Sequence, residues 1–419
     1  MVSLTFLGGT REVGRSAILL QSSQNKVLLD YGVMLNDEPG FPAHIRASEV
    51  DGIIVTHAHL DHSGATPLFY LSEKVPIFGT PITFGLTDVL IKDFIKLSSY
   101  FLPYEYLELE KMMNNRIELR YNEKARIGDI SFRLINAGHI PGSAMIVLEV
   151  DNEKILYTGD FNTRDTHLVK SAKIPDEEFD AVIIESTYAD EDHPERSELE
   201  KEFVGKVKEI IDSDGVVLIP AFAVGRSQEL LSILRFNGYK GDAAMDGMAR
   251  MVNEIMLNNP EFLRESKGFS DFIESCDMVK GWRDRRRAVR RPGVIIAPSG
   301  MLEGGTALFY MEYLAMNESN AVFLVSYQIP NSGGAKLLET NRFVIKGREQ
   351  EVKAQVARYD FSSHVGRSEL REFLKNLKGS PSVYVLHGAE GNCELLASWV
   401  REELKLEGVA PEPSESFKI

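Results

Sequence analysis

Three histidines and one aspartate fall within six positions of this chain, in the stretch His57-Ala58-His59-Leu60-Asp61-His62. Imidazole and carboxylate are the ligand types that borderline metals such as zinc prefer. The alternative is a chance cluster of histidines on a solvated loop. An HxHxDH pattern is far more specific than a lone HxH pair, so we interpret the stretch as part of a metal centre.

The element that positions this stretch is the apolar run directly before it, Ile53-Ile54-Val55. The run is short, continuous and β-branched, which is typical of a buried strand. Backbone that leaves a strand can turn several side chains toward one point, and the sheet holds the loop in place. We therefore expect the metal ligands at the end of a buried strand.

Polar residues follow several other predicted strands in the same way. The chain has nine histidines, and six of them come within a few residues of a strand end. The residues at strand ends are His57, His59, His62, His139, His364, His387, Asp61, Asp160 and Glu185. One tetrahedral zinc needs three protein ligands and a water, so a set of this size suits two metals that share a carboxylate. Asp30 also ends a strand, as a turn residue or as a carboxylate that orients a metal-bound histidine.

Length and composition set the general class of the protein. A chain of 419 residues exceeds the size at which one core keeps growing, so we expect two domains. The hydrophobic fraction of 43% and the charged fraction of 26% are those of an ordinary globular protein. The two cysteines give no disulfide framework, and no signal segment or long apolar span is evident. These features predict a cytoplasmic protein outside any membrane.

The order of predicted elements changes twice along the chain. Residues 1–190 are rich in strands, residues 191–350 alternate helix and strand, and residues 351–419 return to antiparallel-looking strands around 352–359. Alternating helices and strands predict a parallel sheet.

The motifs resemble a known family. Asp30, the HxHxDH stretch, His139 and Asp160 occur in the order found in the metallo-β-lactamase superfamily. Glu185-Ser186-Thr187-Tyr188, the DFSSH segment at 360–364 and the LHG segment at 386–388 resemble the β-CASP subgroup, which holds RNA and DNA nucleases, RNase J among them. Segments 219–230 and 297–305 are similar to those of the nuclease subunit of the pre-mRNA 3′-end cleavage factor and its archaeal relatives. The resemblance covers nearly the whole chain, in the short form without a KH-type extension.

The resemblance implies an α/β fold, a metallo-β-lactamase αββα sandwich with an inserted β-CASP domain. Residues 351–419 would then complete the first domain, and residues 191–350 would be the insertion. The resemblance also implies two zinc ions per chain, with Asp30 supporting the ligands and Asp61 counted among the catalytic residues. The implied ligands are His57, His59 and His139 for one zinc, Asp61, His62 and His387 for the other, and Asp160 as the bridge. His364, positioned by Glu185, would protonate the leaving oxygen, because a ribose alkoxide leaves poorly without a proton donor.

The expected partner is RNA, although the formal net charge of −15 argues against a protein coated by nucleic acid. Six arginines fall within positions 283–291, with Arg286 and Arg287 at the centre. They form either a solvated, ion-paired face or a wall that binds single-stranded RNA in the groove between the domains. Further phosphate-contact candidates, chosen because they offer donors near the motifs, are Arg226, Ser299, Gly300 and Ser363.

The favoured function is a zinc-dependent ribonuclease in RNA processing or decay. Endonuclease and 5′→3′ exonuclease action both stay open, as does a homodimer. The rival functions are a metallo-hydrolase of small thioesters or lactams, a non-catalytic scaffold in RNA processing, and an iron enzyme that reduces oxygen. A thiolate leaves without a proton donor, so His364 and Glu185 argue against the first rival. The complete ligand set argues against the second, and the expectation that no flavin domain follows residue 419 argues against the third.

Overall fold

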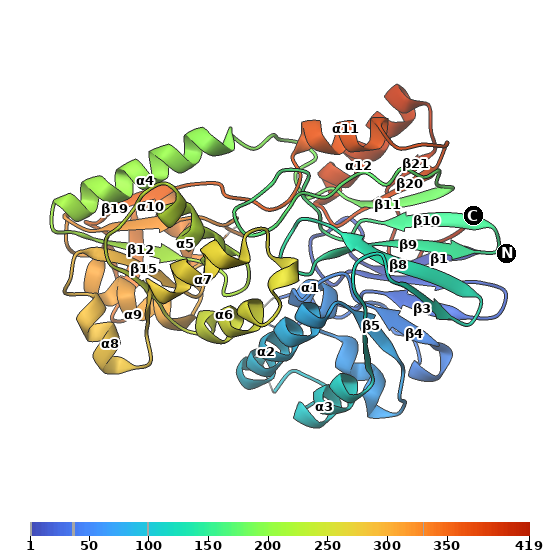
Figure 1. Cartoon of the computed structure of the whole chain (residues 1–419), viewed down its shortest axis with the longest axis horizontal. Coiled ribbons are helices and arrows are strands. Elements are labelled where there is room, and N and C mark those ends of the chain that lie inside the picture. The colour runs from blue at the N-terminus through green and yellow to red at the C-terminus, as the bar shows by residue number, and fades with distance from the viewer. Residues whose placement is uncertain (1, 36–37, 99, 330) are drawn as a thin grey trace. The chain divides into compact units, whose positions relative to one another are not determined.

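The computed structural model describes residues 2–35, 38–98, 100–329 and 331–419. The chain divides into two compact units (Figure 1). Unit 1 contains Met1–Asp165, Val169–Asp192 and Ser363–Ile419, and unit 2 contains Thr166–Leu168 and His193–Ser362. The fold is the α/β arrangement that the motif resemblance implies. None of the described helices is long and apolar enough to cross a membrane.

Unit 1 is built on two seven-stranded sheets. The first has the order β22-β1-β2-β3-β4-β5-β6, formed by Ser416–Lys418, Ser3–Gly8, Ala17–Gln21, Lys26–Leu29, Gly52–Ile54, Ile77–Gly79 and Arg116–Glu118. The second has the order β21-β20-β11-β10-β9-β8-β7, formed by Gly408–Val409, Ser382–Leu386, Ala181–Glu185, Glu153–Tyr157, Ala144–Val150, Ile130–Asn136 and Lys124–Ile127. Strands β3 to β6 are parallel, as are β10, β11, β20 and β21, so their carboxyl ends lie at a common edge of each sheet.

The inner faces of the two sheets pack on each other and form one apolar core. Phe6 and Ile18 of the first sheet and Phe132 and Ile183 of the second belong to this core. The outer face of the first sheet is covered by η2 (Thr66–Leu71), α2 (Pro81–Ser98) and α3 (Tyr106–Asn114), and that of the second by α11 (Arg367–Lys375) and α12 (Glu390–Trp399) (Figure 1). Both sheets are therefore buried on two faces, which gives the expected αββα layering.

Unit 2 is a parallel α/β unit. Its six-stranded sheet has the order β14-β13-β15-β12-β16-β19, formed by Asp277–Met278, Ala243–Met245, Gly293–Ala297, Val216–Pro220, Ala321–Leu324 and Gln355–Arg358. Helices α4 (Arg196–Asp212) and α5 (Arg226–Phe236) share one core with the sheet, and α9 (Gly305–Leu314) and α10 (Gly333–Thr340) share another. The central strands are continuous apolar runs because helices cover both faces. The remaining elements are α6 (Ala249–Leu257), α7 (Ser266–Glu274), α8 (Trp282–Ala288), and the hairpin β17–β18 (Arg342–Ile345 and Arg348–Glu351).

One expectation about the chain after residue 350 is wrong. The alternating segment at 352–359 predicts an antiparallel strand of the first domain, but β19 pairs parallel with β16 in the sheet of unit 2. Alternation reports that one face is more exposed, and an edge strand of a parallel sheet has the same pattern. Unit 2 consequently extends to Ser362.

Candidate metal centre

The side chains predicted to bind metal all lie at strand ends of unit 1. The loop with His57 and His59 follows β4, and Asp30 follows β3, its parallel neighbour. Asp160 follows β10, Glu185 ends β11, and His387 follows β20; these three strands are adjacent and parallel. Parallel strands present their carboxyl ends at one edge, which brings residues from distant parts of the sequence to one place.

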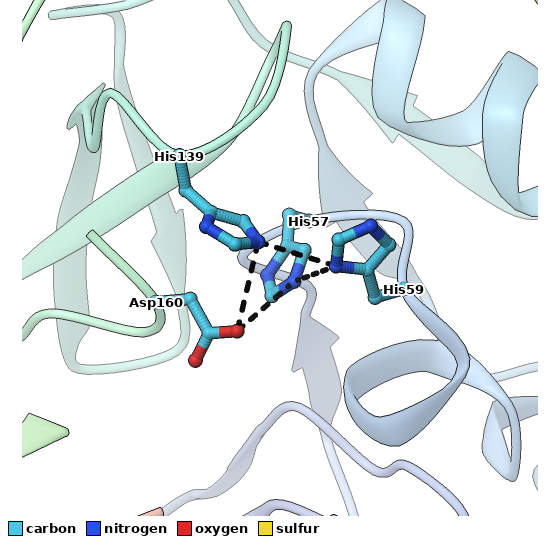
Figure 2. A group of neighbouring side chains, drawn as sticks. All are labelled: His57, His59, His139 and Asp160. Carbon is cyan, nitrogen blue, oxygen red and sulfur yellow. Dashed lines mark hydrogen bonds and ion pairs between the residues drawn. The ribbon is translucent and has the colours of Figure 1, made fainter. Parts of the chain in front are cut away.

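His57, His59, His139 and Asp160 form the first group of side chains that could hold a metal ion (Figure 2). Their ring nitrogens and one carboxylate oxygen point toward one another. His59 Nδ1 lies 3.2 Å from His57 Nε2 and 3.2 Å from His139 Nε2. Asp160 Oδ2 lies 3.6 Å from His57 Nε2 and 3.7 Å from His139 Nε2. Two zinc–nitrogen bonds at a tetrahedral angle separate their nitrogens by about 3.3 Å, so these distances fit one ion.

A second group contains Asp61, His62, Asp160 and His387. Asp160 Oδ1 lies 3.2 Å from His62 Nε2 and 3.2 Å from His387 Nδ1. His387 Nε2 lies 3.3 Å from Asp61 Oδ2. The HxHxDH stretch therefore contributes two residues to each group, and its short helix α1 (Leu60–Ser63) turns Asp61 and His62 away from the first group.

Asp160 belongs to both groups, with Oδ2 facing the first and Oδ1 facing the second. Its carboxylate is buried. Asp160 Oδ1 and His62 Nε2 are close, but within the described part of the chain neither has a hydrogen-bond partner. Buried polar atoms are rarely left in this state unless an ion or water completes the site. The donor types, their spacing and these two atoms all fit a pair of divalent metal ions.

Asp30 orients the ring of His62 through the ring nitrogen that does not face Asp160. The carboxylate is fully buried and accepts hydrogen bonds from the Thr56 backbone amide at 2.7 Å, the Thr56 hydroxyl at 2.8 Å and the Tyr157 hydroxyl at 2.9 Å. His62 Nδ1 lies 2.7 Å from Asp30 Oδ2 and donates its proton there. This hydrogen bond leaves Nε2 of His62 facing Asp160, as expected for a carboxylate that orients a ligand histidine.

His139 is oriented by a backbone group from a distant segment. Its Nδ1 lies 3.0 Å from the carbonyl oxygen of Ser363 and donates a proton to it. Nε2 is then the nitrogen that faces His57, His59 and Asp160. Ser363 was expected to contact RNA phosphate through its donors. That contact stays a prediction; the carbonyl of Ser363 supports a candidate metal ligand, and a backbone carbonyl carries no signal in the sequence.

His364 and Glu185 form a third group with Asp160. His364 Nδ1 lies 2.9 Å from Glu185 Oε2, and His364 Nε2 lies 4.0 Å from Asp160 Oδ2. Glu185 is buried and is held by the Phe161 amide at 2.8 Å and by the Thr187 hydroxyl. Burial lowers the pKa of His364, but the charges of Glu185 and Asp160 outweigh burial and raise this pKa to about 9. His364 is therefore a proton donor near neutral pH.

The other histidines of the centre divide into two classes by pKa. Burial, followed by repulsion from neighbouring imidazoles, lowers the pKa of His57 and His139 well below the ordinary value, and burial also lowers the pKa of His59. Burial also lowers the pKa of His62, but the charges of Asp160 and Asp30 outweigh burial and raise this pKa well above the ordinary value. The three histidines of the first group are thus neutral near pH 7, whereas His62 is protonated and would have to lose that proton to bind a metal ion.

The remaining candidates for RNA contact lie in unit 2. Arg226 begins α5 after β12, and Ser299 and Gly300 follow β15, so all three lie at the carboxyl edge of the parallel sheet. Arg286 and Arg287 are exposed on α8. Thr56, Tyr157 and Thr187 were not among the predicted site residues. Thr56 directly precedes the HxHxDH stretch and Thr187 lies within the motif at 185–188, which is the signal that could have drawn attention to them.

Three family models match successive parts of the chain. The metallo-beta-lactamase superfamily model matches residues 10–184, the Beta-Casp domain model matches 227–337, and the model of the Zn-dependent metallo-hydrolase RNA specificity domain matches 349–411.

Several curated proteins are similar over nearly the whole chain. "RNase aCSPSF2" of Saccharolobus solfataricus is 41% identical over 99% of this chain and 85% of its own length. "Probable RNase MJ4" of Methanocaldococcus jannaschii is 38% identical over 100% of both chains. "Transcription termination factor FttA" of Methanococcus maripaludis is 33% identical over 100% of this chain and 72% of its own. Among solved structures, a protein of unknown function from Enterococcus faecalis V583 has the same fold, with a TM-score of 0.63, 14% identity and 99% coverage of both chains.

Proposed function

This chain belongs to the β-CASP ribonucleases of the metallo-β-lactamase superfamily, and we propose that it cuts RNA at a centre of two zinc ions with His364 as the proton donor. The enzyme is a metal-dependent hydrolase that acts in RNA processing or decay. The observation that supports the two-ion centre best is the position of Asp160, whose two oxygens face two separate groups of ligands.

Each ion would have its own set of side chains. We assign His57, His59 and His139 to one zinc, Asp61, His62 and His387 to the other, and Asp160 to both. When bound, two such ions would supply an activated water and charge to stabilise the phosphate oxygens in an in-line displacement. We count Asp61 among the catalytic residues because it would help to hold the second ion.

The other half of the reaction is the departure of the ribose oxygen. Without a proton this oxygen leaves as a strongly basic alkoxide, which is slow near neutral pH. His364 carries a proton, its Nδ1 is bound to Glu185, and its Nε2 faces Asp160. Nε2–H is thus available to protonate the leaving oxygen, and Glu185 keeps the ring both oriented and charged.

The proposed substrate is single-stranded RNA. We expect the enzyme to act in the cytoplasm. We also predict that RNA enters through an interdomain groove and that its phosphates contact Arg226, Ser299 and Gly300. A homodimer is a further prediction. The enzyme could act as an endonuclease or as a 5′→3′ exonuclease. Circular RNA distinguishes the two, because an endonuclease opens a circle and an exonuclease that needs a 5′ end does not.

The test of the proposed function is cleavage of end-labelled and circular single-stranded RNA by purified, zinc-loaded protein. Cleavage should be abolished by a chelator and by His364→Ala, while His364→Ala keeps its zinc. Intact RNA with zinc-loaded wild-type protein would overturn the proposal in favour of a non-catalytic scaffold. Full activity of His364→Ala would refute the role of His364 as the proton donor and would leave the ribonuclease assignment unaffected.

A further inference from the structure

Unit 2 carries an exposed cationic surface outside the metal centre. The surface is formed by α8, the turn after it and α9, which lie side by side (Figure 1). We call it the arginine–aromatic surface and define it by six residues: Trp282, Arg283, Arg286, Arg290, Arg291 and Tyr313. All six side chains are exposed.

Four arginines of this surface lack a direct ion pair to any described residue, although Arg291 lines a cavity together with Asp242, Asp277 and Asp284. Within the described ranges, the side chains of Arg283, Arg286, Arg290 and Arg291 form no ion pair and no hydrogen bond to another residue. Two neighbouring arginines behave differently. Arg285 binds the buried carboxylate of Asp246 with distances of 2.6 and 3.1 Å, and Arg287 lies 3.3 Å from Asp284. A chain with a net charge of −15 offers many carboxylates, so four unpaired arginines in nine residues favour an anionic partner over internal pairing.

The spacing of the arginines places most of them on one helix face. Positions 283, 286 and 290 are separated by three and four residues, and the hydrogen bond from the Arg290 amide to the Arg287 carbonyl, 3.1 Å long, continues the helical turn past α8. Residues at such intervals are neighbours on a helix surface. The charges therefore form a row, which suits a chain of phosphates better than a single anion.

The same two helices carry two exposed aromatic rings, Trp282 at the start of α8 and Tyr313 on α9. Trp282 is 61% exposed and Tyr313 is 49% exposed. Phe309 lies between them, with ring centroids 5.1 Å from Trp282 and 4.7 Å from Tyr313. The guanidinium of Arg285 lies 5.8 Å from the Trp282 ring and is itself held by Asp246. Each of the two rings thus packs against Phe309 on one side, while much of its surface is exposed to solvent.

We propose that the arginine–aromatic surface binds single-stranded RNA, with phosphates paired to the four arginines and bases stacked on Trp282 and Tyr313. Rows of cations beside exposed aromatic rings are the usual means of holding unpaired nucleic acid, because every base has a face that can stack. The inference rests on the proposed function, since it makes this surface a second contact for the RNA that the enzyme cuts. An acidic protein segment would pair with the arginines but has no base to stack on Trp282.

The chain offers a direct probe of this surface, because it has two tryptophans, Trp282 and Trp399. In a His364→Ala/Trp399→Phe protein, Trp282 is the sole tryptophan and bound RNA is not cut. We expect single-stranded RNA of about 12 nucleotides to quench its fluorescence, and duplex RNA of equal length to quench it less. Poly-glutamate should leave the fluorescence unchanged. Binding of poly-glutamate in preference to RNA, or RNA binding without quenching, would overturn the proposal.

Substitutions separate the charges from the rings. Arg286→Ala/Arg290→Ala should weaken RNA binding. Each phosphate contact to a single strand contributes about 0.7 to the slope of the logarithm of the association constant against the logarithm of the salt concentration, so the loss of two contacts should reduce the magnitude of this slope by about 1.4. Trp282→Ala should weaken binding at least about fivefold. The matched control is Lys346→Ala/Arg348→Ala, which removes two exposed charges from the β17–β18 turn of the same unit. Equal effects of the two double variants would contradict the proposal.

A second readout distinguishes failure of this surface from failure of the proposed function. In the otherwise wild-type enzyme, Arg286→Ala/Arg290→Ala should raise KM for long single-stranded RNA and leave cleavage of a trinucleotide unchanged. An unchanged KM for long RNA would refute the surface while the ribonuclease assignment stands. Loss of cleavage of every RNA by the wild-type protein would instead count against the proposed function.

Discussion

The Nδ1 atom of His364 lies 2.9 Å from a carboxylate oxygen of Glu185, although the segment His193–Ser362 of unit 2 separates the two residues in the sequence. The pair joins the end of β11 to the segment that returns to unit 1. Burial lowers the pKa of this histidine and the charge of Glu185 raises it, with a net rise to about 9. The pair therefore keeps a proton on His364, as the proposed role of a proton donor requires.

Replacing Glu185 should move the pH profile of RNA cleavage. In the proposed mechanism the acid form of His364 is the active one, so activity should fall as pH rises through its pKa. In the metal-free protein this pKa is raised to about 9, and bound zinc ions would lower it by opposing the carboxylates. In Glu185→Gln the raising charge is gone, and the alkaline limb of kcat/KM should shift to lower pH. Thr187→Val is the matched control, because it removes a hydrogen bond to Glu185 and keeps the charge. A limb that does not move in Glu185→Gln would argue against the pairing.

Zinc uptake should release a proton at one site and not at the other. His57, His59 and His139 have lowered pKa values and are neutral near pH 7, whereas the raised pKa of His62 keeps it protonated there. Below the pKa of His62, zinc must displace that proton, so the affinity of the second site should rise about tenfold per pH unit. Calorimetry in buffers with different ionisation enthalpies measures the proton release at each step. Two steps with equal release would be inconsistent with this difference between the histidines.

Asp30 should contribute more than Tyr157, whose hydroxyl it binds, to both the stability of the protein and its affinity for metal. Asp30→Ala removes three protein hydrogen bonds and leaves the buried His62 without its carboxylate, at a cost of about 3 kcal/mol or more in metal-free protein. Tyr157→Phe removes one hydrogen bond, at about 1 kcal/mol. Urea unfolding checks both values. Zinc affinity at the second site should also fall about 10- to 100-fold in Asp30→Ala; comparable losses in the two variants would show that the charge of Asp30 has no special role.

Zinc content should reveal that Asp160 is shared. Because its two oxygens face different groups, Asp160→Ala should weaken both sites, whereas His139→Ala should weaken the first and His387→Ala the second. Elemental analysis after dialysis at limiting zinc gives the stoichiometry of each variant. The account predicts two ions per wild-type chain, about one in each histidine variant and fewer than one in Asp160→Ala. Retention of one tightly held ion in Asp160→Ala would rule out a shared carboxylate.

The sequence predicted the parts of the centre that depend on residue type and strand ends. Histidines and carboxylates after apolar runs are visible as patterns, and parallel strands bring such positions to one edge whatever their separation along the chain. The orienting contacts could not be predicted. The carbonyl of Ser363, the hydroxyl of Tyr157 and the hydroxyl of Thr187 are ordinary groups whose positions depend on tertiary packing.

The strand at 355–358 illustrates the same limit in the fold. Its alternating pattern fits either an antiparallel strand or the edge of a parallel sheet, and only the neighbouring strand decides between them. The arginine cluster was left open between a paired face and a nucleic-acid contact. The structure divides it, because Arg285 is paired to a buried carboxylate and four other arginines are not.

The central claim is that the metal centre cuts RNA with His364 protonating the leaving oxygen, and the most direct test removes the need for that proton. RNA in which sulfur replaces the bridging leaving-group oxygen releases a thiolate, which departs without a proton donor. On ordinary RNA, His364→Ala should be slower than wild type by about 10²- to 10⁴-fold. On the sulfur-substituted RNA, the zinc-loaded variant should approach the wild-type rate. An equally large defect on both substrates would contradict the assigned role of His364.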